Sequence, residues 1–122
     1  MVATPTPMKQ VFQNMGNLSD TAKVEVYAMD LVDLLEEDYK RRYPNSSSPV
    51  KFEIESGRKY WKINQIDGGV HAFIDKKTGE VYKPASWRGP AKIVRYNLLD
   101  AGSRARLFLA RPDWAGSYLY LR

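Results

Sequence analysis

The sequence predicts an α+β domain in which one long amphipathic helix packs on an antiparallel β-meander. Three observations lead to this prediction. Apolar residues recur at helical spacing before residue 44. Short apolar–polar alternations joined by tight turns follow between residues 50 and 84. The composition, with 43% hydrophobic and 27% charged residues, is typical of a globular protein. At 122 residues the chain has the length of one domain with a single core.

The long helix is predicted to begin at an N-cap formed by Ser19 or Asp20 and to end before Pro44. Basic residues at positions 40–42 lie in its last turn, where cations interact favourably with the helix dipole. Acidic residues, namely Asp30, Asp33, Glu36 and Glu37, lie on its polar side. Its apolar side is formed by Val24, Tyr27, Ala28, Leu31, Val32, Leu35 and Tyr39.

Residues 1–17 precede this helix and are rich in Pro, Thr and Asn, with Val11 and Phe12 as apolar anchors. We expect them to form a flexible N-terminal arm that is ordered only when it docks on something. Residues 18–122 then form the single α+β domain. The start of the sequence has no apolar run, so we expect neither a signal peptide nor a membrane anchor.

Four strands are predicted after the helix: "VKFEIES", "KYWKINQID", "VHAFID" and "EVYKP". Short turns at residues 56–58, at 68–69 and at 76–79 join them, and Gly79 stands where a positive φ is favoured. Consecutive strands joined in this way form an antiparallel meander. With the helix packed across one face, this arrangement resembles a cystatin-like roll.

The remainder of the chain gives weaker signals. Gly89-Pro90 is expected to break the last strand, and Asp100 to about Ala110 is expected to form a C-terminal helical segment that ends before Pro112. The stretch "GSYLYLR" is predicted to be a short closing strand.

Strand alternation divides the meander into two faces. We expect one face to be directed at the long helix, with Trp61, Ile63, Val70, Ala72, Ile74 and Val81. The opposite face would carry Tyr60, Lys62, His71, Phe73 and Tyr82. Such an aromatic and basic face is similar in kind to the platforms that stack single-stranded nucleic acid.

Two interpretations of the second face remain at this stage. Residues 88–122 could fold over it, because Leu98, Leu99, Leu107, Phe108 and Trp114 also need burial, and this is the interpretation that the sequence favours. Alternatively the face is open, with cations at turns and strand ends around it, including Arg58 and Lys59. The candidate nucleic-acid-binding residues are then Tyr60, Lys62, Phe73, Lys76, Lys77, Tyr82, Lys83 and Arg88.

Catalytic chemistry is not indicated by any motif. His71 is the one histidine, it lies in a predicted strand, and no neighbouring motif supplies a nucleophile with an orienting carboxylate. The chain has no cysteine, which excludes thiolate zinc sites and disulfides, and Asp30, Asp33 and Glu37 are better explained as a solvated helix face than as metal ligands. We therefore expect no enzyme activity, no metal and no cofactor.

Charge is distributed unevenly along the chain. Residues 1–50 hold five basic and seven acidic residues, whereas residues 51–122 hold fourteen and seven, so the net charges are −2 and +7 and together give +5. A basic half raises the expectation of a polyanionic partner. The alternative is that the charge serves solubility alone.

Four stretches resemble small uncharacterised proteins of tailed bacteriophages, those of marine bacteria among them: "KYWKI", "VHAFIDKKTGEVYKPASW", "VRYNLLD" and "DWAGSYLYL". The resemblance covers about residues 59–121. It implies a phage-encoded accessory or virion-associated protein, located in the host cytoplasm or the virion, and it implies no catalytic or binding residue. We therefore expect a non-catalytic protein that binds a protein partner or itself, with a nucleic-acid-binding module as the alternative and no association with membranes.

Overall fold

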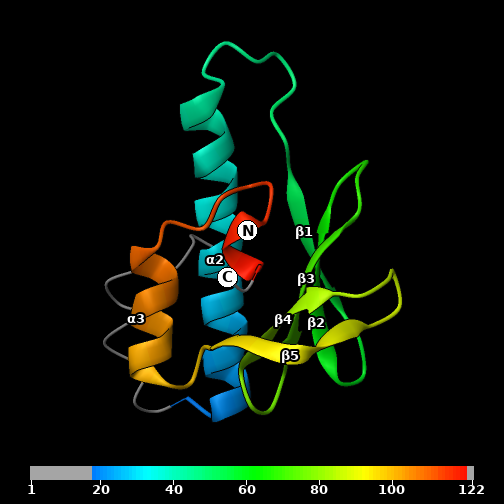
Figure 1. The fold of residues 1–122 in the computed structure, drawn as a ribbon, viewed down its shortest axis with the longest axis vertical. Helices are drawn as coiled ribbons and strands as arrows, with labels where there is room; N and C mark the ends of the chain where they lie inside the picture. Colours follow the sequence, from blue (N-terminus) through cyan, green and yellow to red (C-terminus); the bar gives the residue numbers. More distant parts are fainter. Residues whose placement is uncertain (1–17, 121–122) are drawn as a thin grey trace, which may run out of the picture.

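The chain folds as a five-stranded antiparallel sheet with two helices on one side of it (Figure 1). The computed structural model describes residues 18–120, and the predicted N-terminal arm lies outside them. The elements, in chain order, are α2 (Asp20–Arg42), β1 (Phe52–Ser56), β2 (Tyr60–Gln65), β3 (Val70–Asp75), β4 (Glu80–Pro84), β5 (Pro90–Asn97), α3 (Ala101–Leu109) and the 3-10 helix η2 (Ser117–Leu119). The predicted α+β fold class is confirmed.

Helix α2 begins and ends as its sequence predicts. The Ser19 side chain is the N-cap and accepts a hydrogen bond of 3.2 Å from the backbone N–H of Ala22. At the other end the Tyr43 N–H donates to the Tyr39 carbonyl, and Pro44 follows directly. The predicted apolar side faces the sheet, and its fully buried members are Val24, Ala28, Leu31 and Leu35.

The sheet extends the predicted meander by one strand. Strands β1 to β4 lie where the alternation placed them, and Gly79 has a φ of 76° in the β3–β4 turn. A side chain there would also press against Leu99, since an added Cβ would lie 3.0 Å from its Cγ. The strands pair in the order β1-β2-β3-β4-β5, all antiparallel.

The fifth strand was not predicted. The chain leaves the sheet after Pro84, where β4 ends, and β5 begins at Pro90. Pro90 pairs with Pro84 at the first position of an edge strand, where the missing N–H of proline removes no essential ladder bond. The proline therefore marks where the loop ends and the fifth strand starts.

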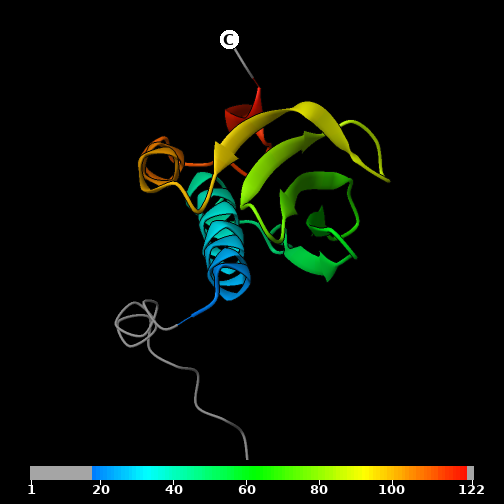
Figure 2. The same ribbon diagram turned by 90° about the horizontal axis from the view of Figure 1, so that it is seen from below.

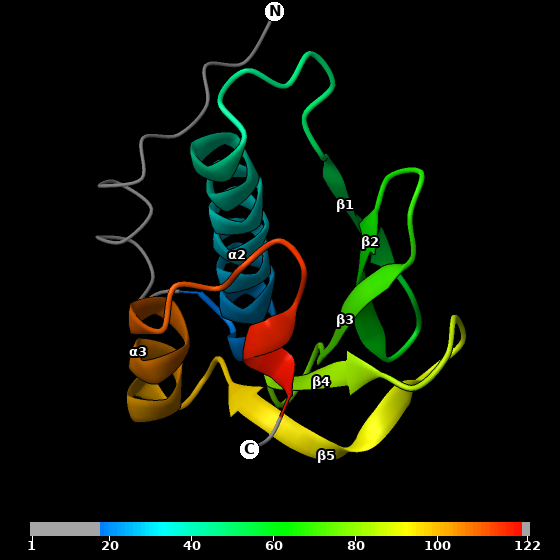
Figure 3. The ribbon, with the colours of Figure 1, turned by 45° about the horizontal axis from the view of Figure 1, so that its top comes forward.

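Both helices cover the same face of the sheet, which we call the inner face (Figure 2). Tail residues after β5 join α2 in one core on this face. Leu98, Leu107 and Leu119 are fully buried in a cluster with Leu31, Ile63 and other inner-face residues, and Phe108, Trp114 and Tyr118 pack against it. Segment η2 lies between α3 and the strands, in front of α2 (Figure 3).

Two predictions for the tail are corrected by this packing. Residues 88–122 were expected to cover the face that carries Tyr60 and Phe73, but the apolar side chains of the tail are buried on the opposite, inner face. The predicted closing strand is the 3-10 turn η2, because Gly116 adopts a φ of 87° and reverses the chain before it can extend. The predicted C-terminal helix is confirmed as α3, whose N-cap Asp100 accepts a bond from Gly102 N.

A matched pair of substitutions in α3 tests this arrangement. Leu107 is fully buried while Leu109 is 82% exposed, although both belong to one helix. We expect Leu107→Ala to lower the free energy of unfolding by about 2–5 kcal/mol, since it leaves a cavity. Leu109→Ala should change it by less than about 0.5 kcal/mol. Urea unfolding followed by circular dichroism measures both, and equal effects would contradict the burial of the tail.

Candidate nucleic-acid interface

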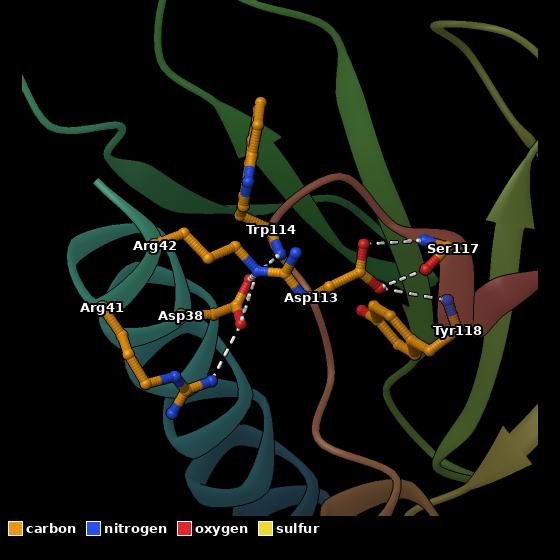
Figure 4. Close-up of polar contacts among 7 residues, drawn as sticks. All are labelled: Asp38, Arg41, Arg42, Asp113, Trp114, Ser117 and Tyr118. Atoms are coloured by element: carbon orange, nitrogen blue, oxygen red, sulfur yellow. Dashed lines mark hydrogen bonds and ion pairs between the residues drawn. The ribbon is translucent and has the colours of Figure 1, made fainter.

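The tail is fixed on the inner face by a buried carboxylate near the end of α2. Asp38 is only 2% exposed, and its Oδ2 accepts a hydrogen bond of 3.0 Å from the backbone N–H of Trp114 (Figure 4). Arg41 Nη2 and Arg42 Nε donate to the same carboxylate at 2.9 and 3.0 Å. The Trp114 ring stands edge-on to Tyr39, with 5.1 Å between ring centroids. The hydrogen bond between Asp38 and Trp114 therefore joins segments that are 76 positions apart in the chain.

A second carboxylate shapes the turn that follows. Asp113 Oδ1 accepts bonds from the Ser117 hydroxyl at 2.7 Å and from the Tyr118 N–H at 3.3 Å (Figure 4). Burial by itself would raise the pKa of Asp113, but these hydrogen bonds from Ser117 and Tyr118 lower it. The ionised carboxylate holds η2 in place, so the tail stays on the inner face.

The opposite face of the sheet, which we call the outer face, carries a cluster of rings around Phe73. The Phe73 ring is 3% exposed, yet it does not belong to the inner core cluster. Tyr60 lies edge-on to both Phe73 and Tyr82, with centroid distances of 5.8 and 6.1 Å. Lys62 Nζ lies 6.0 Å from the Phe73 centroid. Four of the predicted residues are thus brought together. Among them, Tyr60 and Lys62 lie against Phe73 and help to bury its ring.

Trp87, in the β4–β5 loop, completes this face. Lys62 Nζ lies 3.5 Å from the centroid of the Trp87 ring, which is close for a cation–π contact. The Lys62 side chain is only 12% exposed, whereas Trp87 is 57% exposed. The largely covered Lys62 side chain therefore contacts an accessible indole on the outer face. A large exposed ring of this kind offers a surface on which a base can stack.

Acidic residues on the outer face interact with the same cluster. Glu55 lies 3.7 Å from Lys62 Nζ, and Glu80 accepts a hydrogen bond of 3.2 Å from the Tyr82 hydroxyl. Burial of the phenol and the nearby Glu80 carboxylate raise the pKa of Tyr82 to about 12. The Tyr82 hydroxyl therefore stays protonated, as a donor to Glu80, well into the alkaline range.

Cations gather at the end of the sheet where the β1–β2 and β3–β4 turns meet. The Lys76 N–H donates to the Lys59 carbonyl at 3.0 Å, so the two turns are in direct contact. Arg58, Lys59 and Lys77 are exposed there, and Lys59 Nζ lies 5.3 Å from the Tyr60 centroid. We call the three exposed residues, Arg58, Lys59 and Lys77, the cationic end.

Not all of the predicted site residues belong to the outer face. Lys76 Nζ is turned towards Ser56 Oγ at 2.6 Å and towards the Trp61 ring at 4.3 Å. Lys83 lies on the inner side, with its Nζ 4.8 Å from the Tyr120 centroid. Arg88 is exposed in the β4–β5 loop beside Trp87. Lys76 and Lys83 are therefore removed from the candidate interface.

Trp87 is a member of this site that was not predicted from the sequence. The signal was present, because "SWRG" places a large ring next to a cation in a short loop between two strands. Strand alternation assigns faces only to residues within strands, however, and gives no direction to a loop side chain.

Comparison with known proteins gives a family for this chain. Residues 8–121 match a family of unknown function, DUF7717. The chain belongs to the DUF7717 family. No curated protein and no solved structure matches it at a significant level. Among residues 18–120, the DUF7717 chain has no helix long and apolar enough to cross a membrane.

His71 of the DUF7717 chain was predicted on the outer face and lies on the inner one. The pairing of β2 with β3 shifts between Ile63 and Asn64, so His71 becomes an extra residue in β3 and alternation fails at that point. Its ring lies 5.2 Å from the core ring of Phe52, and its Nε2 is 2.7 Å from the Tyr118 hydroxyl. A cavity of about 130 Å³ lies beside it, under Gly116.

The buried His71–Tyr118 pair predicts a pH-dependent stability. Burial lowers the pKa of His71 to about 4 from the ordinary 6.5, although Asp113 acts against this shift. Because the unfolded chain binds the proton more readily, stability is fully present above pH 6.5 and is lost as the pH falls towards 4. We expect this loss to reach about 3 kcal/mol in the wild type and to shrink in His71→Gln.

Urea unfolding at a series of pH values between 4 and 7 measures the loss in both proteins. The comparison of slopes isolates His71, because Asp113 and the other carboxylates are present in both. Parallel slopes for wild type and His71→Gln would show that His71 is not buried in its neutral form.

Proposed function

We propose that this chain is a non-catalytic binding protein that holds single-stranded nucleic acid on its outer face. The observation that carries the proposal is the accessible Trp87 ring, fixed over Lys62 on a sheet face that also presents Tyr60 and Tyr82. Every base has a π-face, so stacking on such rings tolerates many sequences. The cationic end supplies phosphate contacts next to these rings.

A non-catalytic role is supported by the environment of the one histidine. His71 is 8% exposed and shares its Nε2 with a buried phenol, which leaves this nitrogen engaged within the core. No group of three or more potential metal ligands occurs within residues 18–120. Hydrolase activity lost in His71→Ala would speak against this part of the proposal.

The proposal extends to a phage-encoded accessory protein, acting in the host cytoplasm or the virion. Its support is the resemblance of residues 59–121 to small phage proteins. The cystatin-like character of the roll also stays a prediction.

Trp87→Ala is expected to weaken binding of a fluorescent oligothymidylate by about 1–3 kcal/mol, or roughly 5- to 150-fold. The substitution removes one stacking surface, while the 57% exposure of Trp87 limits its effect on folding. Fluorescence anisotropy at low salt measures the dissociation constants of both proteins.

Tyr120→Ala is the matched control, because this ring is 59% exposed but is paired with Lys83 on the inner side. It should bind like the wild type. Affinity should also fall steeply as salt rises, since contacted phosphates release counterions. No binding at low salt, or equal losses in both variants, would end the proposal.

A protein partner is the second candidate, and the edge strand β5 favours it. Ile93 and Val94 in its middle, between Lys92 and Arg95, are 57% and 37% exposed, and within residues 18–120 one side of the strand has no neighbour in the sheet. An exposed apolar edge can add a strand from another chain. The additional strand could come from a second copy or from a different protein.

If β5 pairs with β5 of a second copy, the wild type should self-associate and Ile93→Lys should not. Sedimentation velocity at rising protein concentration measures self-association, and wild type should sediment faster than the variant at the highest concentration. The substitution replaces an exposed apolar side chain between Lys92 and Arg95 with a third cation, which disfavours edge pairing without removing a core side chain. Identical monomeric behaviour of both proteins would exclude pairing between copies of β5.

A further inference from the structure

The cavity beside His71 lies between the strands β3 and β4 and the tail, and it has a volume of about 130 Å³. Its buried end is formed by His71, Gly116 and Leu119, whereas the exposed Gly69 and Tyr120 lie at its rim. A water molecule takes up about 30 Å³ in the liquid, so the cavity has room for roughly four waters or for an organic molecule of similar size. It is therefore a small pocket that can be entered from solvent.

His71 presents a polar edge to this cavity. The residue is 8% exposed, and its Nε2 is engaged by the Tyr118 hydroxyl at 2.7 Å. Its Nδ1 has no hydrogen-bond partner within residues 18–120. Gly116 leaves this edge of the ring uncovered, since an added Cβ would lie 3.4 Å from Cε1 and 3.7 Å from Nδ1. A buried polar atom of this kind takes its partner from water or from a ligand.

The proton of the neutral His71 ring is assigned to this nitrogen. Burial lowers the pKa of His71 to about 4, so one ring nitrogen carries a proton at physiological pH and the other does not. Burial also raises the pKa of Tyr118 well above its ordinary value, so its hydroxyl keeps its proton. Within the described residues that proton has Nε2 as its acceptor. Nδ1 is then an N–H donor at the buried end of the cavity.

Lys83 supplies a positive charge to the same cavity. Its side chain is half-buried, and its Nζ lies 4.8 Å from the centroid of the Tyr120 ring. Lys83 takes no part in the ion pairs among residues 18–120, and no other charged residue of that range lines the cavity. The apolar part of the lining consists of Val70, Pro84, Trp114 and Leu119. An occupant should therefore carry one negative charge, accept a hydrogen bond and have an apolar part.

We propose that this cavity binds a small monocarboxylate of about the size of acetate or propionate, whose carboxylate accepts from His71 Nδ1 and pairs with the Lys83 ammonium. A phosphate suits the cavity less well, because it has more charge and more acceptor oxygens than one ammonium and one N–H can satisfy. The bulge in β3 that directs His71 inwards fits a binding role, since bulges re-aim side chains and are common beside functional sites. This site lies on the inner side and is independent of the outer-face interface.

The experiment titrates the full ¹⁵N-labelled chain with sodium propionate at pH 7 and constant ionic strength. His71 is the one histidine, so its ring nitrogens give signals that cannot be confused with others. In the free protein we expect the proton on Nδ1 and none on Nε2. Propionate should shift the Nδ1 signal and the Gly116 amide with one dissociation constant, on the order of 1 mM. Propionamide has the same shape without the charge and should bind about 10-fold more weakly or less.

A matched pair of lysine substitutions tests the role of Lys83. Lys83→Met removes the ammonium and keeps much of the apolar stem, so it should raise the dissociation constant of propionate about 10-fold or more. Lys77→Met removes the same net charge from the exposed β3–β4 turn and should bind propionate like the wild type. Unchanged amide signals of α2 confirm that each variant is folded.

Four results would overturn the proposal: a proton on Nε2 instead of Nδ1, shifts that sodium chloride alone reproduces, equal affinity for propionamide, or equal losses in the two lysine variants. Inorganic phosphate is titrated in the same way. Tighter binding of phosphate than of propionate would overturn the assignment to a carboxylate.

Discussion

The buried carboxylate of Asp38 is the constraint on which the layout of this molecule depends. A carboxylate that is 2% exposed must find partners, because an uncompensated buried charge is strongly destabilising. Two of its partners are arginines of its own helix, but the third is the backbone N–H of Trp114 in the tail. The tail is thereby tied to the end of α2. It runs over the inner face, where Leu119 completes the core.

This attachment determines what the other face of the sheet can do. With the tail on the inner side, the outer face has to bury Phe73 with its own side chains. Tyr60, Tyr82 and the stem of Lys62 provide that cover. The rings thus stabilise the sheet and shape its surface at once. Trp87 differs, because its exposed ring contributes mainly to the surface.

Much of the fold could be predicted because it follows from local patterns. The stripe on α2, its Ser19 cap and the alternation of β1 to β4 are all properties of short segments. The side of the sheet taken by the tail could not be predicted, because it depends on a contact between Asp38 and Trp114 across 76 positions. His71 was misplaced for a related reason, since a bulge between paired strands reverses the alternation.

The candidate site was predictable to a similar extent. Tyr60, Lys62, Phe73 and Tyr82 could be grouped by alternation, and the structure brings them together. Lys83 was included because it is basic and near in sequence. Side chains alternate between the two faces along β4, however, and that of Lys83 is directed towards Tyr120 on the inner side. Trp87 lies in a loop, where no periodicity gives direction. Loop side chains near a sheet face are thus the residues that sequence reasoning is most prone to overlook.

Charge is also separated in space, which bears on how a polyanion would approach the proposed interface. The acidic residues of α2 belong to the helix layer, whereas Arg58, Lys59 and Lys77 project from turns of the sheet. A polyanion would be repelled from the acidic side of α2, formed by Asp30, Asp33 and Glu37, and attracted to the cationic end. Exposed charges of this kind act over about one Debye length and guide association without fixing position. Position would then be set by the rings next to them, beginning with Tyr60 beside Lys59.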